Sequence, residues 1–248
     1  MQPIMIRHRL KSFAARFGID ISRRRIVSGM HYGPIIPLAT YSPWFDDREF
    51  MRTFRIAEKN TLVDIYRCHE LWELVGQVAD VPGALLEVGV WRGGTGAIIA
   101  ARAKQLGMSK MTYLCDTFEG VAKAGAMDTT YRGGEHADTS QSMVEGLLQR
   151  LDLTNVEILK GIFPDDAKDA LVDERFAFVH VDVDVYQSAK GVVEFCWPRM
   201  PVGGVVVFDD YGFWSCDGIP KLVGEYRGKE DRIVLHNLNG HAVMIKKR

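Results

Sequence analysis

Several features are missing from this chain of 248 residues, and each absence excludes a class of protein. No apolar run approaches the roughly 18 to 20 residues that a membrane-spanning helix requires. The N-terminus lacks the continuous apolar segment of a signal peptide. The formal net charge of −1 disfavours a dedicated nucleic-acid binder. We therefore expect a cytoplasmic protein with no nucleic-acid partner.

Cysteine is scarce as well. The four cysteines lie far apart, and neither a CxxC pair nor a zinc-type spacing of cysteine and histidine occurs. Cys115 and Cys196 stand in apolar runs, which predicts that they are small core residues in a reducing compartment. The cysteine pattern therefore predicts no zinc site.

Strand and helix patterns alternate along most of the chain, as is typical of α/β proteins. Strands are expected at 84–90, 111–116, 155–160, 176–182, 202–209, 231–236 and 241–246, and helices at 62–79, 95–106, 138–151, 164–171 and 186–197. Thr61 is the expected N-cap of the first of these helices. We predict a mainly parallel, seven-stranded sheet with helices on both faces, closed by an antiparallel hairpin through Asn237–Gly240.

Three segments fall outside this alternation. Residues 1–25 are strongly basic, with Asp20 their only acid, and apolar residues recur there at helical spacing. We expect a helical extension that packs on the body, with weak contact to an anionic membrane surface or an acidic partner as the alternative. Residues 31–50, rich in proline and aromatics, are predicted to be a loop. Residues 117–137 lack periodicity, and so long a loop is expected to be a functional lid or a disordered segment.

Carboxylates end two of the predicted strands. One β-branched run leads into Asp182 and Asp184, and a second leads into Asp209 and Asp210. Because the carboxyl ends of parallel strands meet at one edge of the sheet, these side chains are expected to converge where α/β proteins bind ligands. Converging carboxylates form an oxygen-rich site suited to Mg²⁺ or Ca²⁺.

A glycine-rich turn follows the first predicted strand. It matches neither standard phosphate motif, because Trp91 occupies the middle glycine position of GxGxxG and no Gly-Lys-Ser/Thr sequence is present. Gly89, Gly93 and Gly94 allow the backbone to approach a ligand closely. Glu87 would repel a phosphate, and it suits an ammonium group or an ordered water beside one.

Asp116 ends the second predicted strand, where an acid can accept both hydroxyls of a ribose. A ribose-binding acid beside a turn that is unsuited to phosphate favours S-adenosylmethionine as cofactor. That molecule carries an ammonium group and no phosphate.

Four motifs in one order resemble the macrocin O-methyltransferase family, whose metal-dependent members use S-adenosylmethionine to methylate sugar hydroxyls. They are Leu86–Gly96, Asp116–Gly120, His180–Tyr186 and Asp209–Tyr211. The resemblance runs from about residue 60 to the C-terminus. It implies the Rossmann-like class I methyltransferase fold, which we place at 81–248. Residues 1–80 are expected to form a basic, helical extension that serves the substrate or an oligomer.

The resemblance also implies site residues. Asp182, Asp209 and Asp210 are expected to bind Mg²⁺, which agrees with the argument from strand ends. Ile162 stands where a small or acidic residue is expected on the adenine side. The cofactor is expected to contact Glu87, Gly89, Val90, Trp91, Arg92, Gly93, Gly94, Thr95, Asp116, Thr117, Phe118, Gly161, Ile162 and Asp182.

The expected reaction is an in-line methyl transfer from a sulfonium, in which the enzyme positions the acceptor hydroxyl and removes its proton. Metal coordination would stabilise the developing alkoxide. Asp184, two residues beyond Asp182 on the same strand face, is the first candidate for the general base, and His136 in the long loop is the second. His180 is expected to be structural and to face away from the metal.

Alternatives remain at this stage. A Mg²⁺-dependent hydrolase or phosphotransferase would need a phosphate cradle. A methyltransferase for catechol-like phenols could stack its acceptor on Trp44, Phe45 and Trp214, although the Asp182-x-Asp184 pair favours sugars. A non-catalytic binding protein would not need buried, unpaired acids. The sugar acceptor could be a nucleotide sugar, a glycosylated small molecule or a surface glycan, and a homo-oligomer formed through helix 62–79 is expected.

Overall fold

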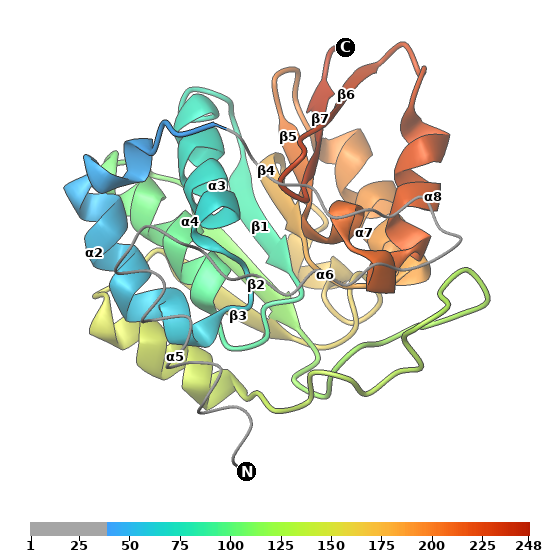
Figure 1. Cartoon of the computed structure of the whole chain (residues 1–248), viewed down its shortest axis with the longest axis horizontal. Helices are drawn as coiled ribbons and strands as arrows, with labels where there is room; N and C mark the ends of the chain where they lie inside the picture. Colours follow the sequence, from blue (N-terminus) through green and yellow to red (C-terminus); the bar gives the residue numbers. More distant parts are fainter. Residues whose placement is uncertain (1–38) are drawn as a thin grey trace. The chain divides into compact units, whose positions relative to one another are not determined.

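A computed structural model describes residues 39–248 (Figure 1). The predicted basic helix and the first part of the predicted loop at 31–50 lie outside the described residues. No helix in the described part of the chain is both long and apolar enough to cross a membrane.

Seven strands form one sheet in the order β3-β2-β1-β4-β5-β7-β6. The strands are β1 (Ala84–Val88), β2 (Thr112–Asp116), β3 (Val156–Lys160), β4 (Phe176–Val181), β5 (Val205–Phe208), β6 (Arg232–His236) and β7 (Ala242–Lys246). The first five strands pair in parallel, and β7 pairs antiparallel with both β5 and β6. The predicted seven-stranded, mainly parallel α/β sheet with its closing hairpin is confirmed.

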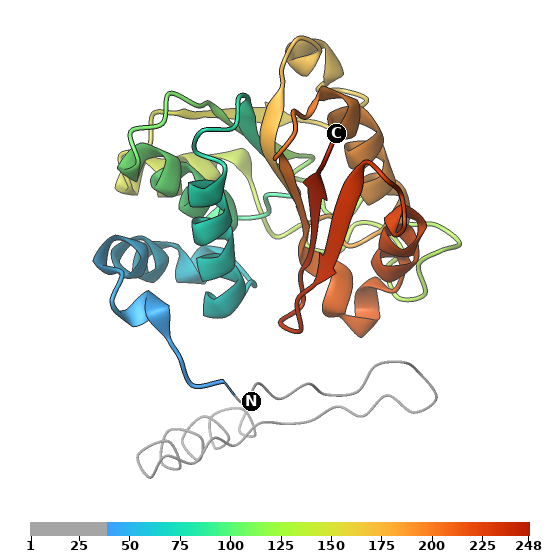
Figure 2. The same ribbon diagram turned by 90° about the horizontal axis from the view of Figure 1, so that it is seen from above.

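Helices cover both faces of the sheet (Figures 1 and 2). They are α2 (Arg48–Ala57), α3 (Ile65–Gln77), α4 (Gly94–Gln105), α5 (Gln141–Arg150), α6 (Lys168–Leu171), α7 (Tyr186–Cys196) and α8 (Gly218–Tyr226). Short 3-10 helices are η1 (Pro43–Phe45), η2 (Glu58–Asn60), η3 (Trp197–Arg199), η4 (Asp209–Gly212) and η5 (Trp214–Cys216).

Alternation along the strands assigns each face its helices, since successive side chains of a strand point to opposite faces. Leu85 of β1 packs with Leu71 and Val75 of α3, whereas its neighbour Leu86 packs with Val192 of α7 on the other face. Cys115 and Cys196 are buried in the core, as the sequence predicts.

The segment before β1 shares this core. Leu71, Trp72 and Val75 of α3 are buried, and Phe50 of α2 packs against Trp72. The apolar face of α3 is therefore used within the chain and is not left free for an oligomer contact. That residues 1–80 serve the substrate or an oligomer stays a prediction.

Two helices and one cap differ from the sequence prediction. α2 begins inside the predicted loop 31–50, because Asp47 accepts a hydrogen bond from the backbone N–H of Phe50 and starts the helix. α8 was not predicted; Pro220 sits in its first turn, where a missing N–H is tolerated. Asp64, not Thr61, caps α3 by accepting hydrogen bonds from the N–H groups of Tyr66 and Arg67.

The long loop contains no helix or strand between residues 117 and 140, as predicted, but it is tethered. Asp128 is buried and accepts hydrogen bonds from Tyr186 N at the start of α7 (2.9 Å) and from Gly125 N (3.0 Å). Thr129 N donates to Asp217 (2.9 Å), next to α8. The loop is therefore tethered to the start of α7 and to the residue before α8, which does not fit a disordered segment. Its role as a functional lid stays a prediction.

Candidate functional site

A pocket of about 290 Å³ opens at the carboxyl edge of the parallel strands. Residues at or just beyond the ends of β1, β2, β3, β4 and β5 line it, together with the η2–α3 connection, the long loop and the segment after η4. The candidate base residues Asp184 and His136 and the candidate metal ligands line this pocket as well.

The structure separates the predicted cofactor residues into two groups. The pocket is lined by Gly89, Val90, Trp91, Thr95, Asp116, Thr117, Gly161, Ile162 and Asp182. It is not lined by Glu87, Arg92, Gly93, Gly94 or Phe118. The structure thus places the first group, and not the second, at the pocket. The cofactor contacts of both groups stay predictions.

Arg92 and Phe118 have other partners. Arg92 forms an ion pair with Asp138 (2.6 Å) and lies over the ring of Trp91. Phe118 packs against the apolar cluster around Leu114. Both side chains thus support the walls of the site from behind.

The turn after β1 depends on glycine at position 89. Its φ is +88°, and a Cβ atom there would lie 1.7 Å from the carbonyl oxygen of Asp182. Asp116 fixes the same turn, since its Oδ2 accepts hydrogen bonds from Val90 N (2.6 Å) and Trp91 N (2.8 Å). Its Oδ1 accepts from Phe118 N (2.6 Å). The β1 turn and the end of β2 are therefore one rigid unit.

Glu87 lies behind the pocket wall. Its side chain is fully buried, and one carboxylate oxygen lies 2.8 Å from Nδ1 of His180. The other oxygen has no hydrogen-bond partner among the described residues, and a Cβ on Gly96 would come within 2.5 Å of it. Gly96 thus leaves room for a buried carboxylate, and direct contact of Glu87 with an ammonium group is not supported.

Asp182, Asp209 and Asp210 converge as predicted. Each offers a carboxylate oxygen, and these three atoms lie within 4.8 Å of one another. Burial, reinforced by the neighbouring carboxylates, holds the pKa of Asp182 and of Asp210 well above the usual range. A set of hard oxygen donors with this unbalanced negative charge fits a divalent cation such as Mg²⁺.

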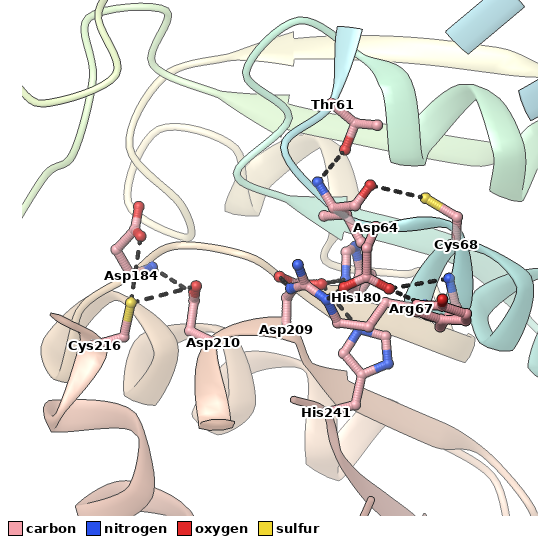
Figure 3. A network of polar contacts seen from close by, with 12 residues as sticks. Thr61, Asp64, Arg67, Cys68, His180, Asp184, Asp209, Asp210, Cys216 and His241 are labelled. Atoms are coloured by element: carbon pink, nitrogen blue, oxygen red, sulfur yellow. Dashed lines mark hydrogen bonds and ion pairs between the residues drawn. The ribbon is translucent and has the colours of Figure 1, made fainter. Parts of the chain in front are cut away.

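Asp209 differs from its two neighbours because cationic side chains surround it (Figure 3). Arg67 of α3 forms an ion pair with its Oδ2, and Nε2 of His241 lies 2.9 Å from its Oδ1. Burial alone would raise the pKa of Asp209, but the nearby imidazoles of His180 and His241 and the charge of Arg67 outweigh burial and lower it.

His180 is structural, as expected, but it does not face away from the carboxylates. Its Nε2 lies 3.5 Å from Asp209 Oδ1. Residues two apart on a strand share a face, so His180 and Asp182 point the same way. Burial lowers the pKa of His180, but the nearby carboxylates of Asp209 and Glu87 more than offset this effect and raise it to about 9.

The two candidate bases meet through Tyr131. Its hydroxyl hydrogen-bonds to Asp184 and lies 3.3 Å from Nε2 of His136, which is exposed. Asp184 has a φ of +64°, and its N–H donates to Asp210 Oδ2 (2.8 Å). Burial raises the pKa of Asp184, while the hydrogen bond from Tyr131 opposes the increase. Asp184 therefore lies between Asp210 on one side and, on the other, Tyr131, which leads to the exposed His136.

Several pocket residues were not found from the sequence. They are Arg67, Tyr131, Phe213 and Cys216, with His241 directly behind the wall. The Sγ of Cys216 lies 3.5 Å from Asp210 and 3.6 Å from Asp184. No local motif marks these residues, because their importance arises only from what the fold places beside them.

Comparison with known proteins gives consistent relatives. A model of the macrocin-O-methyltransferase (TylF) family matches residues 55–247. The tetracenomycin-type 8-demethyl-8-(2,3-dimethoxy-alpha-L-rhamnosyl)-tetracenomycin-C 4'-O-methyltransferase of Streptomyces olivaceus is 33% identical over 182 residues, covering 68% of each chain. Demethyldecarbamoylnovobiocin O-methyltransferase of Streptomyces niveus is 30% identical over 188 residues, covering 71% of this chain and 70% of that protein.

Solved structures agree on the fold. The O-methyltransferase NovP superposes with a TM-score of 0.66 at 25% identity and covers 76% of this chain and 83% of its own. The calicheamicin methyltransferase CalS11 superposes with a TM-score of 0.63 at 18% identity, covering 87% and 99%. The seven-stranded sheet and its helices are therefore those of class I methyltransferases.

Proposed function

The chain belongs to the macrocin O-methyltransferase family, and from this premise we propose that it methylates a sugar hydroxyl of a glycoside with the help of Mg²⁺. Membership makes the chain an O-methyltransferase with S-adenosylmethionine as its cofactor. The acceptor and the metal are the proposed parts. The observation that carries the proposal is the placement of Asp184 beside the Asp182–Asp209–Asp210 cluster in one pocket.

The cofactor side of the pocket suits a ligand without phosphate. The N–H groups of Val90 and Trp91, which a phosphate-binding turn would offer to an anion, already donate to Asp116. Gly89 lets the backbone come close to a ligand at the end of β1. S-adenosylmethionine supplies an electrophilic methyl group, and these residues would fix its position. The same geometry weakens the alternative of a hydrolase or phosphotransferase.

The chain's own acid–base groups would handle the acceptor proton. Asp184 lines the pocket and is the group best placed to accept that proton from the hydroxyl. Its partner Tyr131 and the exposed His136 continue the hydrogen-bonded path outward. We therefore assign the base to Asp184 and a supporting role to His136.

Asp182, Asp209 and Asp210 would hold Mg²⁺. A cation held by these residues would supply positive charge that favours loss of a proton from the acceptor hydroxyl. The raised pKa values of Asp182 and Asp210 support this assignment, because a bound cation would balance their charge.

The pocket favours a neutral glycoside over a nucleotide sugar. Among the described residues that line it, Arg67 is the only arginine or lysine. Its guanidinium is already paired with Asp209 and Asp64. A diphosphate would therefore meet carboxylates without an unpaired arginine or lysine side chain in the pocket lining to balance its charge. Leu62 and Phe213 add apolar surface for an aglycone.

A catechol-like acceptor is less well supported. Trp44, Phe45 and Trp214, which were expected to stack on an aromatic ring, do not line the pocket. Trp44 instead packs edge-on against Tyr66 and His69 of α3. The stacking surface expected for a phenol is thus not at the site.

The proposal is tested by titrating the protein calorimetrically with S-adenosylhomocysteine, with Mg²⁺ and then with chelator. Release of S-adenosylhomocysteine is then measured with neutral glycosides and with nucleoside-diphosphate sugars as acceptors. We expect cofactor binding in both conditions, and turnover that needs Mg²⁺ and prefers neutral glycosides. Equal turnover with chelator would refute the metal role, and a preference for nucleoside-diphosphate sugars would refute the acceptor class.

A further inference from the structure

Asp209 is enclosed by a ring of side chains that begins and ends on α3. Figure 3 shows Arg67 and His241 on either side of its carboxylate. We propose that Arg67, His241 and Glu70 are positioning residues that lock the Asp209 carboxylate in the orientation needed to bind a divalent cation. This inference rests on the metal site of the proposed function, and it assigns a role to residues that do not touch the metal themselves.

The contacts form an unbroken sequence. Nε of Arg67 donates to Asp64 (2.8 Å), while its Nη1 is paired with Oδ2 of Asp209. Oδ1 of Asp209 lies 2.9 Å from Nε2 of His241, whose Nδ1 lies 2.5 Å from Oε2 of Glu70. Both oxygens of Asp209 are therefore held, each from a different direction.

α3 can supply three members of this ring because of their spacing. Asp64, Arg67 and Glu70 follow one another at intervals of three residues, which places them along one side of the helix. Asp64 also caps the helix by accepting from Tyr66 N and Arg67 N, so the start of the helix and the position of Arg67 are fixed together. α3 thus helps to orient the Asp209 carboxylate, and its apolar face packs in the core.

The geometry of His241 matches this role. Each of its ring nitrogens lies within hydrogen-bond distance of a carboxylate oxygen, Nδ1 beside Glu70 and Nε2 beside Asp209. His241 is fully buried and cannot exchange these partners for water. An ionised carboxylate has about four lone-pair positions, so Asp209 keeps acceptor capacity for a cation after binding Arg67 and His241.

A rigid carboxylate binds a cation more tightly than a rotating one, because less orientational freedom is lost. Partners of this kind, one shell removed from a metal, typically contribute about 10- to 100-fold in metal affinity. Within residues 39–248, neither Asp182 nor Asp210 forms an ion pair, so we expect the effect to act through Asp209.

The test uses Mn²⁺ as the probe and the full-length chain, with the dissociation constant measured from the electron paramagnetic resonance of free Mn²⁺. Glu70→Gln is the leading variant, because its side chain is 25% exposed and its loss leaves the core intact. The matched control is Glu73→Gln on the same helix, whose side chain is 49% exposed and pairs with Arg102. Thermal unfolding and S-adenosylhomocysteine affinity are measured for each.

We expect Glu70→Gln and His241→Gln to weaken Mn²⁺ binding by about 10- to 100-fold, with S-adenosylhomocysteine affinity unchanged and Glu73→Gln like wild type. If the His241→Gln protein does not fold, the Mn²⁺ affinity of Glu70→Gln alone tests the positioning role. Wild-type affinity for Mn²⁺ in a folded Glu70→Gln protein would overturn the positioning role alone. Absence of Mn²⁺ binding by the wild type would instead overturn the metal site, and the positioning role with it.

Discussion

Asp184 shows how much one residue depends on its neighbours. Its backbone adopts a left-handed φ of +64°, which is uncommon for a non-glycine residue, and its N–H is bound by Asp210. Its carboxylate faces Tyr131 and Cys216. Left-handed backbone of this kind gathers at functional sites, where the surrounding contacts fix it.

At the residue scale, we predict that Asp184→Asn lowers kcat by about 10²- to 10⁴-fold, because an amide cannot remove the proton of the sugar hydroxyl. S-adenosylhomocysteine affinity should stay near the wild-type value. Turnover with the preferred glycoside and calorimetric titration measure the two effects. Substantial activity in this variant would move the base to His136, for which His136→Gln is the companion measurement.

Two glycines with almost the same φ allow a second residue-scale prediction. A Cβ on Gly89 (φ +88°) would collide with the Asp182 carbonyl oxygen, whereas a Cβ on Gly134 (φ +87°) would meet nothing within 4 Å. Gly134→Ala should cost only the backbone strain of about 1 kcal/mol. Gly89→Ala should cost more and abolish S-adenosylhomocysteine binding. Chemical denaturation and calorimetry separate these outcomes; equal destabilisation would contradict the close approach at Gly89.

Among the elements, α7 has an unusual start. Its N-cap residue Val185 has no side chain able to cap, and Asp128 of the long loop, 58 residues upstream, accepts from Tyr186 N instead. Gly218 at the start of α8 leaves the space, because a Cβ there would lie 2.1 Å from Asp128 Oδ1. The Asp128 carboxylate thus ties the loop to α7 and lies close to the start of α8.

We predict at the element scale that Asp128→Ala destabilises the protein by about 1–3 kcal/mol, since the cap and a buried acceptor are lost together. The loop that carries Tyr131 should also exchange its amide hydrogens faster. Equilibrium denaturation and hydrogen exchange test this. Asp138→Ala, on the same loop at an exposed position, is the control; equal effects of the two changes would argue against a tether at Asp128.

At the scale of the whole molecule, a cation bound at the proposed metal site would stabilise the folded state. A cation that binds only the folded state stabilises it by about 2.7 kcal/mol at a concentration 100 times its Kd. In a chain of this length each kcal/mol raises Tm by about 2–4 °C. We predict that Mg²⁺ raises the Tm of the wild type and leaves that of Asp210→Asn unchanged. Thermal scans with Mg²⁺ and with chelator measure this difference in Tm. An equal rise in Tm in both proteins would mean that the ion binds away from Asp210.

The sequence by itself determined the layout of the sheet and the convergence of its carboxylates. Strand and helix periodicities are properties of the local sequence. The run Val205–Phe208, for example, is followed directly by two aspartates, whatever fold the chain adopts. Because parallel strands share their carboxyl edge, Asp182 and Asp209 had to meet once the fold was recognised. Family resemblance added the cofactor and the expected roles, from motifs that are also contiguous in the chain.

Only the tertiary structure decided which side chains contact those aspartates. Arg67 and Asp209 are 142 residues apart, and nothing local to either marks the pair. The sequence motif predicted that Glu87 contacts the cofactor. In the structure its side chain is buried beside Gly96 and His180 and does not line the pocket. The physical reason is that periodicity encodes which side of an element is buried, whereas the partners of a buried charge depend on side chains brought together from distant segments.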